Sequence, residues 1–438
     1  MNNHTIYRQP AQLLQKLIQF DTTNPPGNEA ACVAYIQGLL EDAGIPSTFL
    51  ARDPNRPNLI ARLPGQGRAA PLLLYGHVDV VTTAHQNWSH SPFAGEEIDG
   101  TIWGRGALDM KGGVAMMVSA FLRAKAEGAE LPGDVILAIL SDEEGGGDFG
   151  AAFLVSEHPE QFENVRYAIG EFGGFSLYIG GKTFFPIQVA EKQICWLKAT
   201  VRGSGGHGSR VIQGGTMARL GQFLLDLDQN LLPVHITPVV ESMMGEVADA
   251  LPAPVDGLVR QLLDPAKTDD VIKLLGKEGD AFNPLLRNTI NATIVRGGEK
   301  INVIPSMIEL ELDGRSLPGF SPQDIIDEVQ AIVGPDIEFE VVRHDPGPSD
   351  PDMGLYPVLA NILREAVPDS TPIPYLLQGV TDARYFTLLG IQTYGFLPMT
   401  IPPGLDFRML VHNADERIPA DAVRFGAEAV YQALLRFT

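Results

Sequence analysis

Two adjacent carboxylates, Glu143 and Glu144, follow a stretch that predicts a buried strand. Residues 135–140 are all apolar, and three glycines come directly after the pair. Because neighbouring carboxylates repel each other, a positive charge is expected close to them. A metal ion that binds one carboxylate leaves the other free to act as a general base on water. A solvated acidic turn could have the same composition, but the position after a buried strand favours a metal site.

Further residues of metal-binding type stand just beyond apolar runs, in a glycine-rich loop or shortly before the last predicted helix: His77, Asp109, Glu171 and His412. Each of them alone could be an ordinary polar residue. With Glu144, however, they supply two imidazoles and three carboxylates, which can hold two Zn²⁺ ions if one carboxylate bridges them. Asp79, two residues after His77, could accept a hydrogen bond from its ring and so fix the tautomer of that ligand.

These residues need a scaffold that brings distant parts of the chain to one edge. Apolar runs at residues 58–63, 72–75, 135–140 and 167–170 predict strands. Helical spacing of apolar residues predicts helices within 10–43 and at 112–126. Strands that alternate with helices indicate an open α/β sheet, in which ligands bind beyond the carboxyl ends of the strands. The candidate residues occupy such positions.

The pattern changes at about residue 188. Alternating strands at 196–201, 288–295, 307–312 and 337–342, with helices at 216–227 and 322–333, predict a smaller α+β domain with an antiparallel sheet. A helix at 356–366, a strand at 393–396 and a helix at 420–437 return to the first pattern. We therefore expect an α/β domain over 1–188 plus 349–438, whose mixed, mostly parallel sheet is flanked by helices, and an inserted domain over 189–348. Residues 231–284 fit no regular pattern.

The composition narrows the range of partners. Thirty-two basic residues against 54 acidic ones give a formal charge of −22, which argues against nucleic acid, since phosphate binding needs clustered Lys and Arg. The two cysteines, Cys32 and Cys195, suit a reducing compartment. No signal peptide and no apolar run of about 20 residues is visible. We expect a soluble, cytoplasmic protein that binds neither nucleic acid nor membrane.

The candidate residues lie in strings that together resemble one family. The strings GHVDVV, GRGALDMKGG, SDEEGGG, GGHGS, GGEKINVIP, GVTDAR and VHNADER occur in this order between about residue 10 and the C-terminus. They are similar to motifs of the M20 family of metallopeptidases, which includes aminoacylase-1, carboxypeptidase G2, acetylornithine deacetylase and succinyl-diaminopimelate desuccinylase. The resemblance implies a zinc-peptidase-like catalytic domain with an inserted lid and dimerisation domain, and therefore a homodimer.

The resemblance also implies how the ligands divide. His77 and Glu171 would bind one zinc ion. Glu144 and His412 would bind the other. Asp109 would bridge the two ions, with a cis peptide bond to the residue that follows it. Each chain would thus hold two Zn²⁺, although the same ligand types also admit Co²⁺ or Mn²⁺.

The remaining roles concern proton transfer and the substrate. By resemblance, Glu143 would be the general acid and base, and Asp79 would orient His77. His207, on the inserted domain, would reach into the partner subunit's site and stabilise the oxyanion. The resemblance further implies substrate contacts for four residues: Asn302, Arg315, Gly379 and Arg384.

The activity expected is cleavage of an amide or peptide bond next to a free carboxylate of a small-molecule substrate. N-acyl-amino acid deacylase and carboxypeptidase or dipeptidase activities fit this description equally. A deacylase of acyl-diamino acids in amino-acid biosynthesis is an alternative. A non-catalytic scaffold of the same fold is another, but it predicts gaps among the ligands or at the base, and the sequence has none.

Overall fold

The computed structural model describes residues 3–438, and its contacts divide the chain into two compact units. The first unit runs to Val189 and also includes Pro351–Tyr375 and Thr381–Thr438. The second unit comprises Ala190–Asp350 and Leu376–Val380. The chain passes between the units close to the expected breaks after residues 188 and 348, and the short segment Leu376–Val380 belongs with the inserted unit.

A nine-stranded mixed sheet forms the centre of the first unit, in the order β1-β2-β6-β3-β7-β17-β9-β16, with β8 paired to β9. Strands β6, β3, β7 and β17 run parallel, whereas β1, β2 and β9 pair antiparallel to their neighbours. The predicted mostly parallel central sheet is therefore confirmed. The strand bounds are β1 Ser47–Leu50, β2 Asn58–Leu63, β3 Leu72–His77, β6 Val135–Leu140, β7 Tyr167–Gly170, β8 Leu177–Ile179, β9 Lys182–Glu191, β16 Ser370–Leu377 and β17 Gln392–Gly395.

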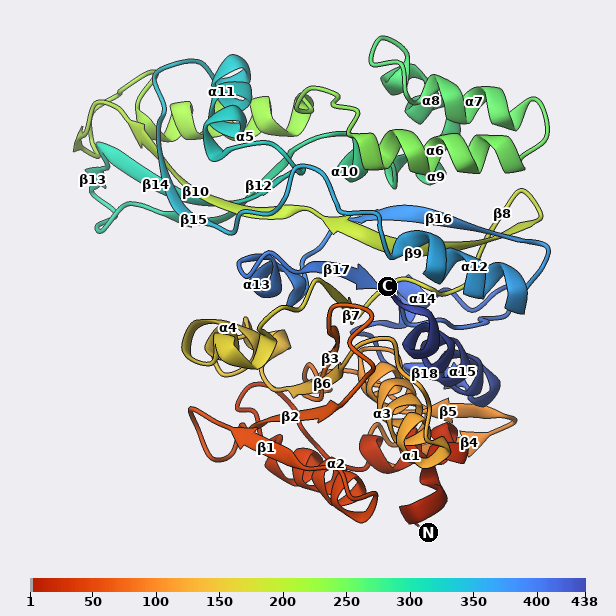
Figure 1. Cartoon of the computed structure of the whole chain (residues 1–438). Coiled ribbons are helices and arrows are strands. Elements are labelled where there is room, and N and C mark those ends of the chain that lie inside the picture. Colours follow the sequence, from red (N-terminus) through yellow and green to blue (C-terminus); the bar gives the residue numbers. More distant parts are fainter. Residues whose placement is uncertain (1–2) are drawn as a thin grey trace. The chain divides into compact units, whose positions relative to one another are not determined.

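Helices cover both faces of this sheet. Every residue of β3 and β6 is buried, which explains their continuous apolar sequences. Side chains of α4 (Ala151–Glu157) and α13 (Ala383–Thr387) join the core on one face. The long helix α3 (Lys111–Glu127) lies against the other face, with α1 (Pro10–Ile18) and α15 (Ala420–Arg436) packed on it (Figure 1).

Smaller elements complete the first unit. A three-stranded sheet has the order β18-β5-β4. Among the described residues, the elements not yet given are η1 Asn3–Arg8, α2 Ala30–Asp42, β4 Glu96–Ile98, β5 Thr101–Trp103, η2 Glu143–Gly145, η3 Pro159–Phe162, α12 Tyr356–Ala366, α14 Phe407–Leu410 and β18 Arg417–Pro419.

The second unit is built on an antiparallel sheet in the order β12-β14-β10-β15. Helices α5 and α11 share a buried apolar cluster with the inward-facing side chains of this sheet. The bounds are β10 Gln193–Arg202, α5 Thr216–Gln229, β12 Thr289–Arg296, β14 Met307–Ser316, α11 Pro322–Val333 and β15 Glu338–His344. A two-stranded sheet pairs β11 (Gly206–His207) with β13 (Val303–Ile304).

The stretch 231–284, which showed no regular pattern, is mostly helical. It contains α6 Pro238–Ala250, α7 Val255–Gln261, α8 Thr268–Leu275 and α9 Lys277–Asp280, and α10 Asn283–Leu286 extends past its end. All but the first are at most eight residues long, and Pro or Gly occurs in most of the connections between them. Segments of this length are too short for helical periodicity to stand out.

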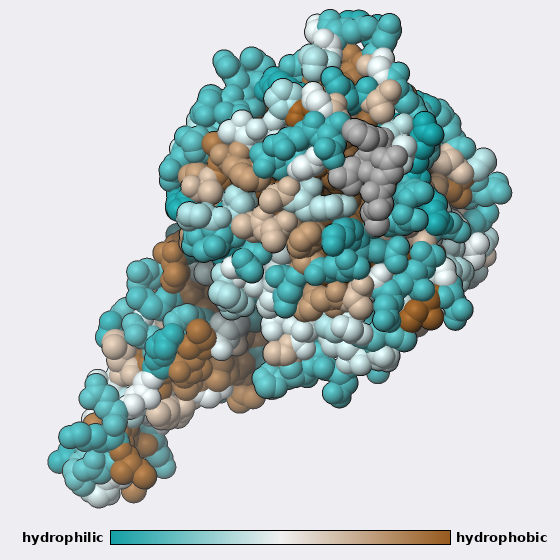
Figure 2. Space-filling model, turned by 90° about the horizontal axis from the view of Figure 1, so that it is seen from below, coloured by the Kyte–Doolittle hydropathy of each residue, from teal (hydrophilic) through white to brown (hydrophobic). Residues whose placement is uncertain are grey.

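The surface is that of a charged protein. Much of the face drawn in Figure 2 is hydrophilic, and apolar residues lie between the polar ones in patches. No helix within residues 3–438 is both long enough and apolar enough to cross a bilayer.

Candidate metal centre

Three neighbouring parallel strands deliver the first candidate ligands. His77 is the last residue of β3, Glu143 and Glu144 lie in η2 just after β6, and Glu171 directly follows β7. Since β6, β3 and β7 are adjacent and parallel, their carboxyl ends meet at one edge of the sheet. Asp109 comes to the same place from the loop before α3.

Asp109 stands between two imidazoles. Its Oδ1 lies 3.2 Å from His77 Nε2, and its Oδ2 lies 3.2 Å from His412 Nε2. Glu171 Oε2 is 3.4 Å from His77 Nε2, and Glu144 Oε2 is 3.2 Å from His412 Nε2. The Asp109–Met110 peptide bond is cis, in agreement with the resemblance. The five candidate ligands therefore form two groups that share one carboxylate.

Glu143 lies against the same cluster. One group of potential ligand atoms within 4.8 Å of one another comprises His77, Glu143 and Glu171, and a second comprises His77, Asp109 and Glu144. Glu143 Oε2 is 4.0 Å from His77 Nε2. Glu143 therefore lies within reach of the same centre as the five candidate ligands.

The electrostatics of the cluster fit divalent cations. Burial, and then the nearby Glu171, raise the pKa of Glu143 well above its usual value. Burial and the charge of Asp109 raise the pKa of Glu144 to about 7. Burial opposes ionisation of Asp109, but hydrogen bonds from His412 and His77 hold its pKa below the usual range. Burying several carboxylates close together is unfavourable, because their charges repel one another and lose contact with water. A bound cation would offset this cost. The donor set, imidazole and carboxylate, is also the set that Zn²⁺ accepts.

Asp79 contacts both the ring of His77 and the backbone of Glu143 and Glu144. His77 Nδ1 lies 3.0 Å from the backbone carbonyl oxygen of Asp79 and 3.4 Å from its carboxylate. The carboxylate accepts the backbone N–H groups of Glu143 and Glu144, each at 3.1 Å, and the side-chain amide of Asn24 at 2.8 Å. The predicted contact to the histidine ring thus exists mainly through the backbone, and the carboxylate positions the segment that carries the glutamates.

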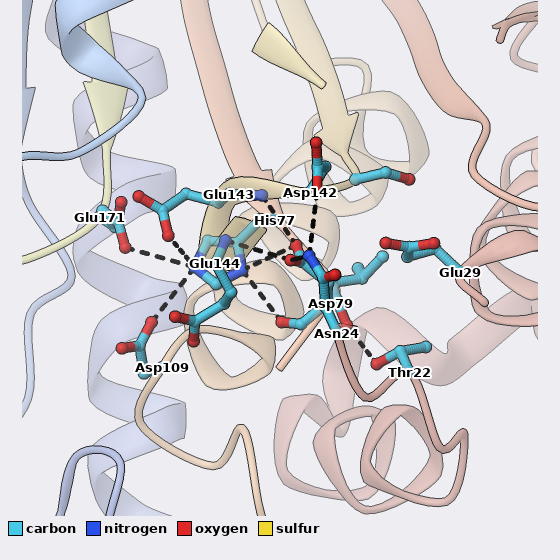
Figure 3. A network of polar contacts seen from close by, with 12 residues as sticks. Thr22, Asn24, Glu29, His77, Asp79, Asp109, Asp142, Glu143, Glu144 and Glu171 are labelled. Carbon is cyan, nitrogen blue, oxygen red and sulfur yellow. Dashed lines mark hydrogen bonds and ion pairs between the residues drawn. The ribbon is translucent and has the colours of Figure 1, made fainter. Parts of the chain in front are cut away.

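A buried network of polar side chains is joined to Asp79 through Asn24 (Figure 3). This network was not predicted from the sequence. Asn24 also donates to Asp142 Oδ1 at 3.0 Å. The same oxygen is 2.9 Å from Arg56 Nη2, and Arg56 in turn pairs with buried Glu29 at 2.7 Å. No local spacing signals this network, because its members are separated by up to 118 residues along the chain.

Glu416 plays a comparable part for Asp109 and was also missed. It is fully buried and accepts the backbone N–H groups of Gly106, Leu108 and Asp109 at 3.1, 2.7 and 3.1 Å. It also pairs with Arg105 at 2.6 Å. This single carboxylate therefore fixes the loop that presents the shared ligand. Its position within VHNADER was the only available signal.

Arg384 lies in the first unit, where burial opposes the charge of its guanidinium but nearby Asp382 raises the pKa of that group. Its Nη2 donates to the backbone oxygen of Gly146 at 3.2 Å and to the Tyr385 hydroxyl at 3.3 Å. The neighbouring Asp382 is buried, and burial raises its pKa to about 7. A guanidinium placed here suits a substrate carboxylate.

His207 lies in the second unit on an exposed turn. Its Nδ1 accepts the backbone N–H of Ser209 at 3.3 Å and lies 2.7 Å from the Ser209 hydroxyl. A neutral imidazole whose Nδ1 accepts carries its proton on Nε2, so that Nε2 can donate. The backbone of Asn302 accepts the N–H of Gly208 at 2.8 Å, which brings Asn302 next to this turn.

Two further substrate-binding candidates belong to the second unit. Arg315 stands near the far end of β14 and pairs with Asp313 at 2.7 Å. This contact gives Arg315 an ion-pair partner on its own strand. Gly379 lies in the short segment that groups with the second unit, and nothing lies within 4 Å of where its Cβ would be.

Comparisons with known proteins identify the family of the chain. The family model described as peptidase family M20/M25/M40 matches residues 73–436. The chain is 28% identical over 375 residues to N-fatty-acyl-amino acid synthase/hydrolase PM20D1 of Homo sapiens, covering 83% of this chain and 73% of that protein. It is 25% identical over 438 residues to aminoacylase-1 of Sus scrofa, covering 97% and 93%.

Solved structures share the fold. The M20 family metallo-carboxypeptidase Sso-CP2 from Sulfolobus solfataricus superimposes with a TM-score of 0.67 at 16% identity, covering 98% of both chains. Human carnosine dipeptidase 1 superimposes with a TM-score of 0.61 at 16% identity, covering 99% of this chain and 97% of that one. The chain therefore belongs to the M20/M25/M40 peptidase family and is an amide- or peptide-bond hydrolase of that type.

Proposed function

We propose that this enzyme is a dinuclear zinc hydrolase that cleaves an amide or peptide bond next to a free carboxylate. The observation that carries the proposal is the position of Asp109, whose two carboxylate oxygens face different imidazoles at 3.2 Å each. In this proposal His77 and Glu171 hold one ion, and Glu144 and His412 hold the other. Cobalt or manganese could replace zinc at such ligands.

Bound zinc would polarise the scissile carbonyl and lower the pKa of water. Glu143 accepts the proton of the attacking water and returns it to the leaving amine. Its burial and its crowded surroundings, which raise its pKa, suit a group that must hold a proton during turnover. Asp79 keeps this carboxylate in place through the backbone N–H of Glu143.

The two ends of the substrate need different partners. Arg384 binds the free carboxylate, since its guanidinium donates to the backbone oxygen of Gly146, in the segment that follows Glu143 and Glu144, and can also donate to a planar anion. His207 stabilises the developing oxyanion as a hydrogen-bond donor through Nε2. Asn302 is the neighbour of His207 that would contact substrate with it. The roles of Arg315 and Gly379 in substrate binding rest on the family resemblance alone.

A homodimer is part of the proposal, with His207 acting in the site of the partner subunit. The edge strand β12 supports it, because this strand exposes Ile294 and Val295 by 39% and 51% of their surface. An apolar edge strand is a ready surface for pairing with a second chain.

N-acyl-amino acids, C-terminal residues of peptides and dipeptides are the substrate classes that this site favours, and a deacylase of acyl-diamino acids is the alternative. The relatives include an aminoacylase, a fatty-acyl-amino acid hydrolase and a probable carboxypeptidase S-like protein. The non-catalytic alternative lacks support, since all five ligands and Glu143 are present in the described chain.

The experiment is a hydrolysis screen of N-acyl-amino acids, dipeptides and acylated diamino acids with added zinc, cobalt or manganese. We expect turnover of substrates with a free carboxylate, and none of the matching carboxamides. Equal turnover of acid and amide would contradict the carboxylate requirement. A metal-loaded protein inert toward the whole panel would favour the scaffold.

A further inference from the structure

A cavity of about 230 Å³ opens beside the metal centre within the first unit. Asp109 and Glu171 form its polar side. The rest of its wall is apolar: Leu108, Met110, Phe172, Leu397, Phe407 and Val411. A concave, mostly apolar site with a few polar groups at one side is typical of a binding pocket for a small molecule.

The aromatic part of the wall is well packed. The rings of Phe172 and Phe407 meet edge to face with centroids 5.8 Å apart, and Phe175 stacks on Phe407 at 4.6 Å. The ring of Tyr375 stacks on that of Phe172 with centroids 5.9 Å apart. Rings supported in this way give the pocket a fixed shape before a ligand arrives.

Phe172 has a backbone φ of 64°, a left-handed conformation that is costly for a large side chain. It directly follows Glu171, a candidate ligand. Such strain is retained at sites where a side chain must point in one direction. Here the strained backbone sets the ring into the cavity wall next to the metal centre.

The chemistry of the proposed reaction decides which end of the substrate faces this cavity. The leaving amine carries the free carboxylate, and it must lie near Glu143 and Arg384. Arg384 donates to the backbone oxygen of Gly146, and none of these three residues lines the cavity. Because Glu171 lines the cavity and lies in one cluster with Glu143, the other substituent of the carbonyl carbon, the acyl group, can enter the cavity. Figure 3 shows the carboxylates of Asp109 and Glu171 on the side of His77 away from Asn24 and Glu29.

We propose that the cavity binds an apolar acyl group, so that the enzyme prefers N-acyl-amino acids of medium chain length to N-acetyl-amino acids. The inference rests on the proposed function and specifies its substrate. A methylene group takes up about the volume of a water molecule, roughly 30 Å³. The cavity therefore has room for roughly six to eight carbons of an acyl chain. Each methylene that enters it should raise kcat/KM about threefold to fourfold.

The test measures kcat/KM of the zinc-loaded full chain for one amino acid acylated with acetyl, butanoyl, hexanoyl, octanoyl and dodecanoyl groups. We expect a rise from acetyl to hexanoyl or octanoyl and no further gain at dodecanoyl. A flat series, or a maximum at acetyl, would overturn the inference while leaving the hydrolase intact. Absence of hydrolysis throughout the series and the panel above would instead overturn the proposed function.

Phe407→Ala should enlarge the cavity and move the maximum toward dodecanoyl. Met409→Ala is the matched control, because Met409 lies on the same helix, is 68% exposed and does not line the cavity. Its chain-length profile should match the wild type. If Phe407→Ala does not fold, Phe407→Leu gives the same comparison with a smaller loss of volume. A change in preference for the amino-acid side chain, with the acyl profile unaltered, would contradict the assignment of the acyl group to this cavity.

Discussion

The metal centre of the first unit and the His207 turn of the second unit hold their side chains in different ways. At the candidate metal centre, buried carboxylates fix the backbone that carries the candidate residues: Asp79 holds the segment of Glu143 and Glu144, and Glu416 holds the loop of Asp109. His207, in contrast, is exposed and bonded mainly to its neighbour Ser209.

The difference separates two tasks. Ligands that must meet a metal ion at fixed distances gain from a shell of buried partners, which orients them before the ion binds. A histidine that stabilises charge only during the reaction must carry its proton on the donating ring nitrogen. Its position can be less rigid than that of a metal ligand. Substitutions of the candidate ligands or of their buried partners should therefore change metal binding, whereas substitutions at the His207 turn should change only turnover.

Metal removal should give the largest effect. Dialysis against a chelator should lower hydrolysis by on the order of 10³ or more, because the ions polarise the carbonyl and activate water. Added zinc should restore it. Activity that survives with less than one tenth of the metal left would contradict a metal-dependent site.

His207→Ala should lower kcat by on the order of 10²–10³, the usual cost of losing one oxyanion donor, with the metal content unchanged. Ser209→Ala is the control for the turn, since the backbone N–H that sets the tautomer remains, and its effect should be much smaller. Loss of metal in His207→Ala would contradict the claim that the His207 turn affects turnover and not metal binding.

Mixing two inactive variants tests whether His207 acts in the site of the partner subunit. Co-refolded His207→Ala and Glu143→Gln chains should recover about a quarter of the wild-type activity, because in a symmetric dimer a mixed pair keeps one intact site. Proven subunit exchange without recovery would contradict action across the dimer.

Glu416→Gln should weaken metal binding about 10–100-fold, the usual cost of losing an outer partner of a ligand. The amide keeps the shape but cannot accept all three loop N–H groups and Arg105 as the carboxylate does. Competition with a chelator gives the affinity, and Glu97→Gln, an exposed glutamate of β4, is the control. Equal affinities in both variants would show that Glu416 does not position Asp109.

The smallest expected effect concerns stability in the second unit. Lys192 is buried and donates to the backbone oxygen of Arg287 at 2.8 Å. Burial, and then the charge of Arg315, lower its pKa to about 7, whereas an unfolded lysine titrates near pH 10.4. Between these values the unfolded chain binds more protons, so stability rises with pH by at most about 1.4 kcal/mol per unit. Below about pH 7 the full cost of burying the charge remains.

Lys192→Met removes this titration. Its free energy of unfolding in urea should therefore rise less between pH 7 and 9 than that of the wild type. Lys273→Met, at an exposed position of α8, should keep the wild-type slope. If the slope of Lys192→Met also equals that of the wild type, Lys192 remains charged in the folded protein.

Local patterns were enough to predict much of the fold. Strands β6 and β7 match the predicted runs 135–140 and 167–170, since continuous apolar sequences mark buried parallel strands. The helix at 322–333 also matches, because Ser321 and Asp324 form a capping box at its start. The short helices within 231–284 carry no comparable periodicity.

The candidate site divides in the same way. His77, Glu144 and Glu171 could be predicted as candidate ligands, because each lies at or just after the end of a strand that the sequence predicts. Asn24, Arg56 and the role of Glu416 were not, because their contacts join segments that only the folded chain brings together. Sequence reasoning thus found the groups that could bind metal and missed those that hold them.

The separation of Glu143 from the ligands is the central claim, since both glutamates lie within reach of the histidines. The most direct measurement is the metal content and turnover of Glu143→Gln beside Glu144→Gln. We predict that Glu143→Gln keeps two metal ions per chain and loses turnover by about 10²–10⁴-fold. Glu144→Gln should lose one ion. Equal loss of metal in both variants, or turnover that survives in Glu143→Gln, would contradict the account.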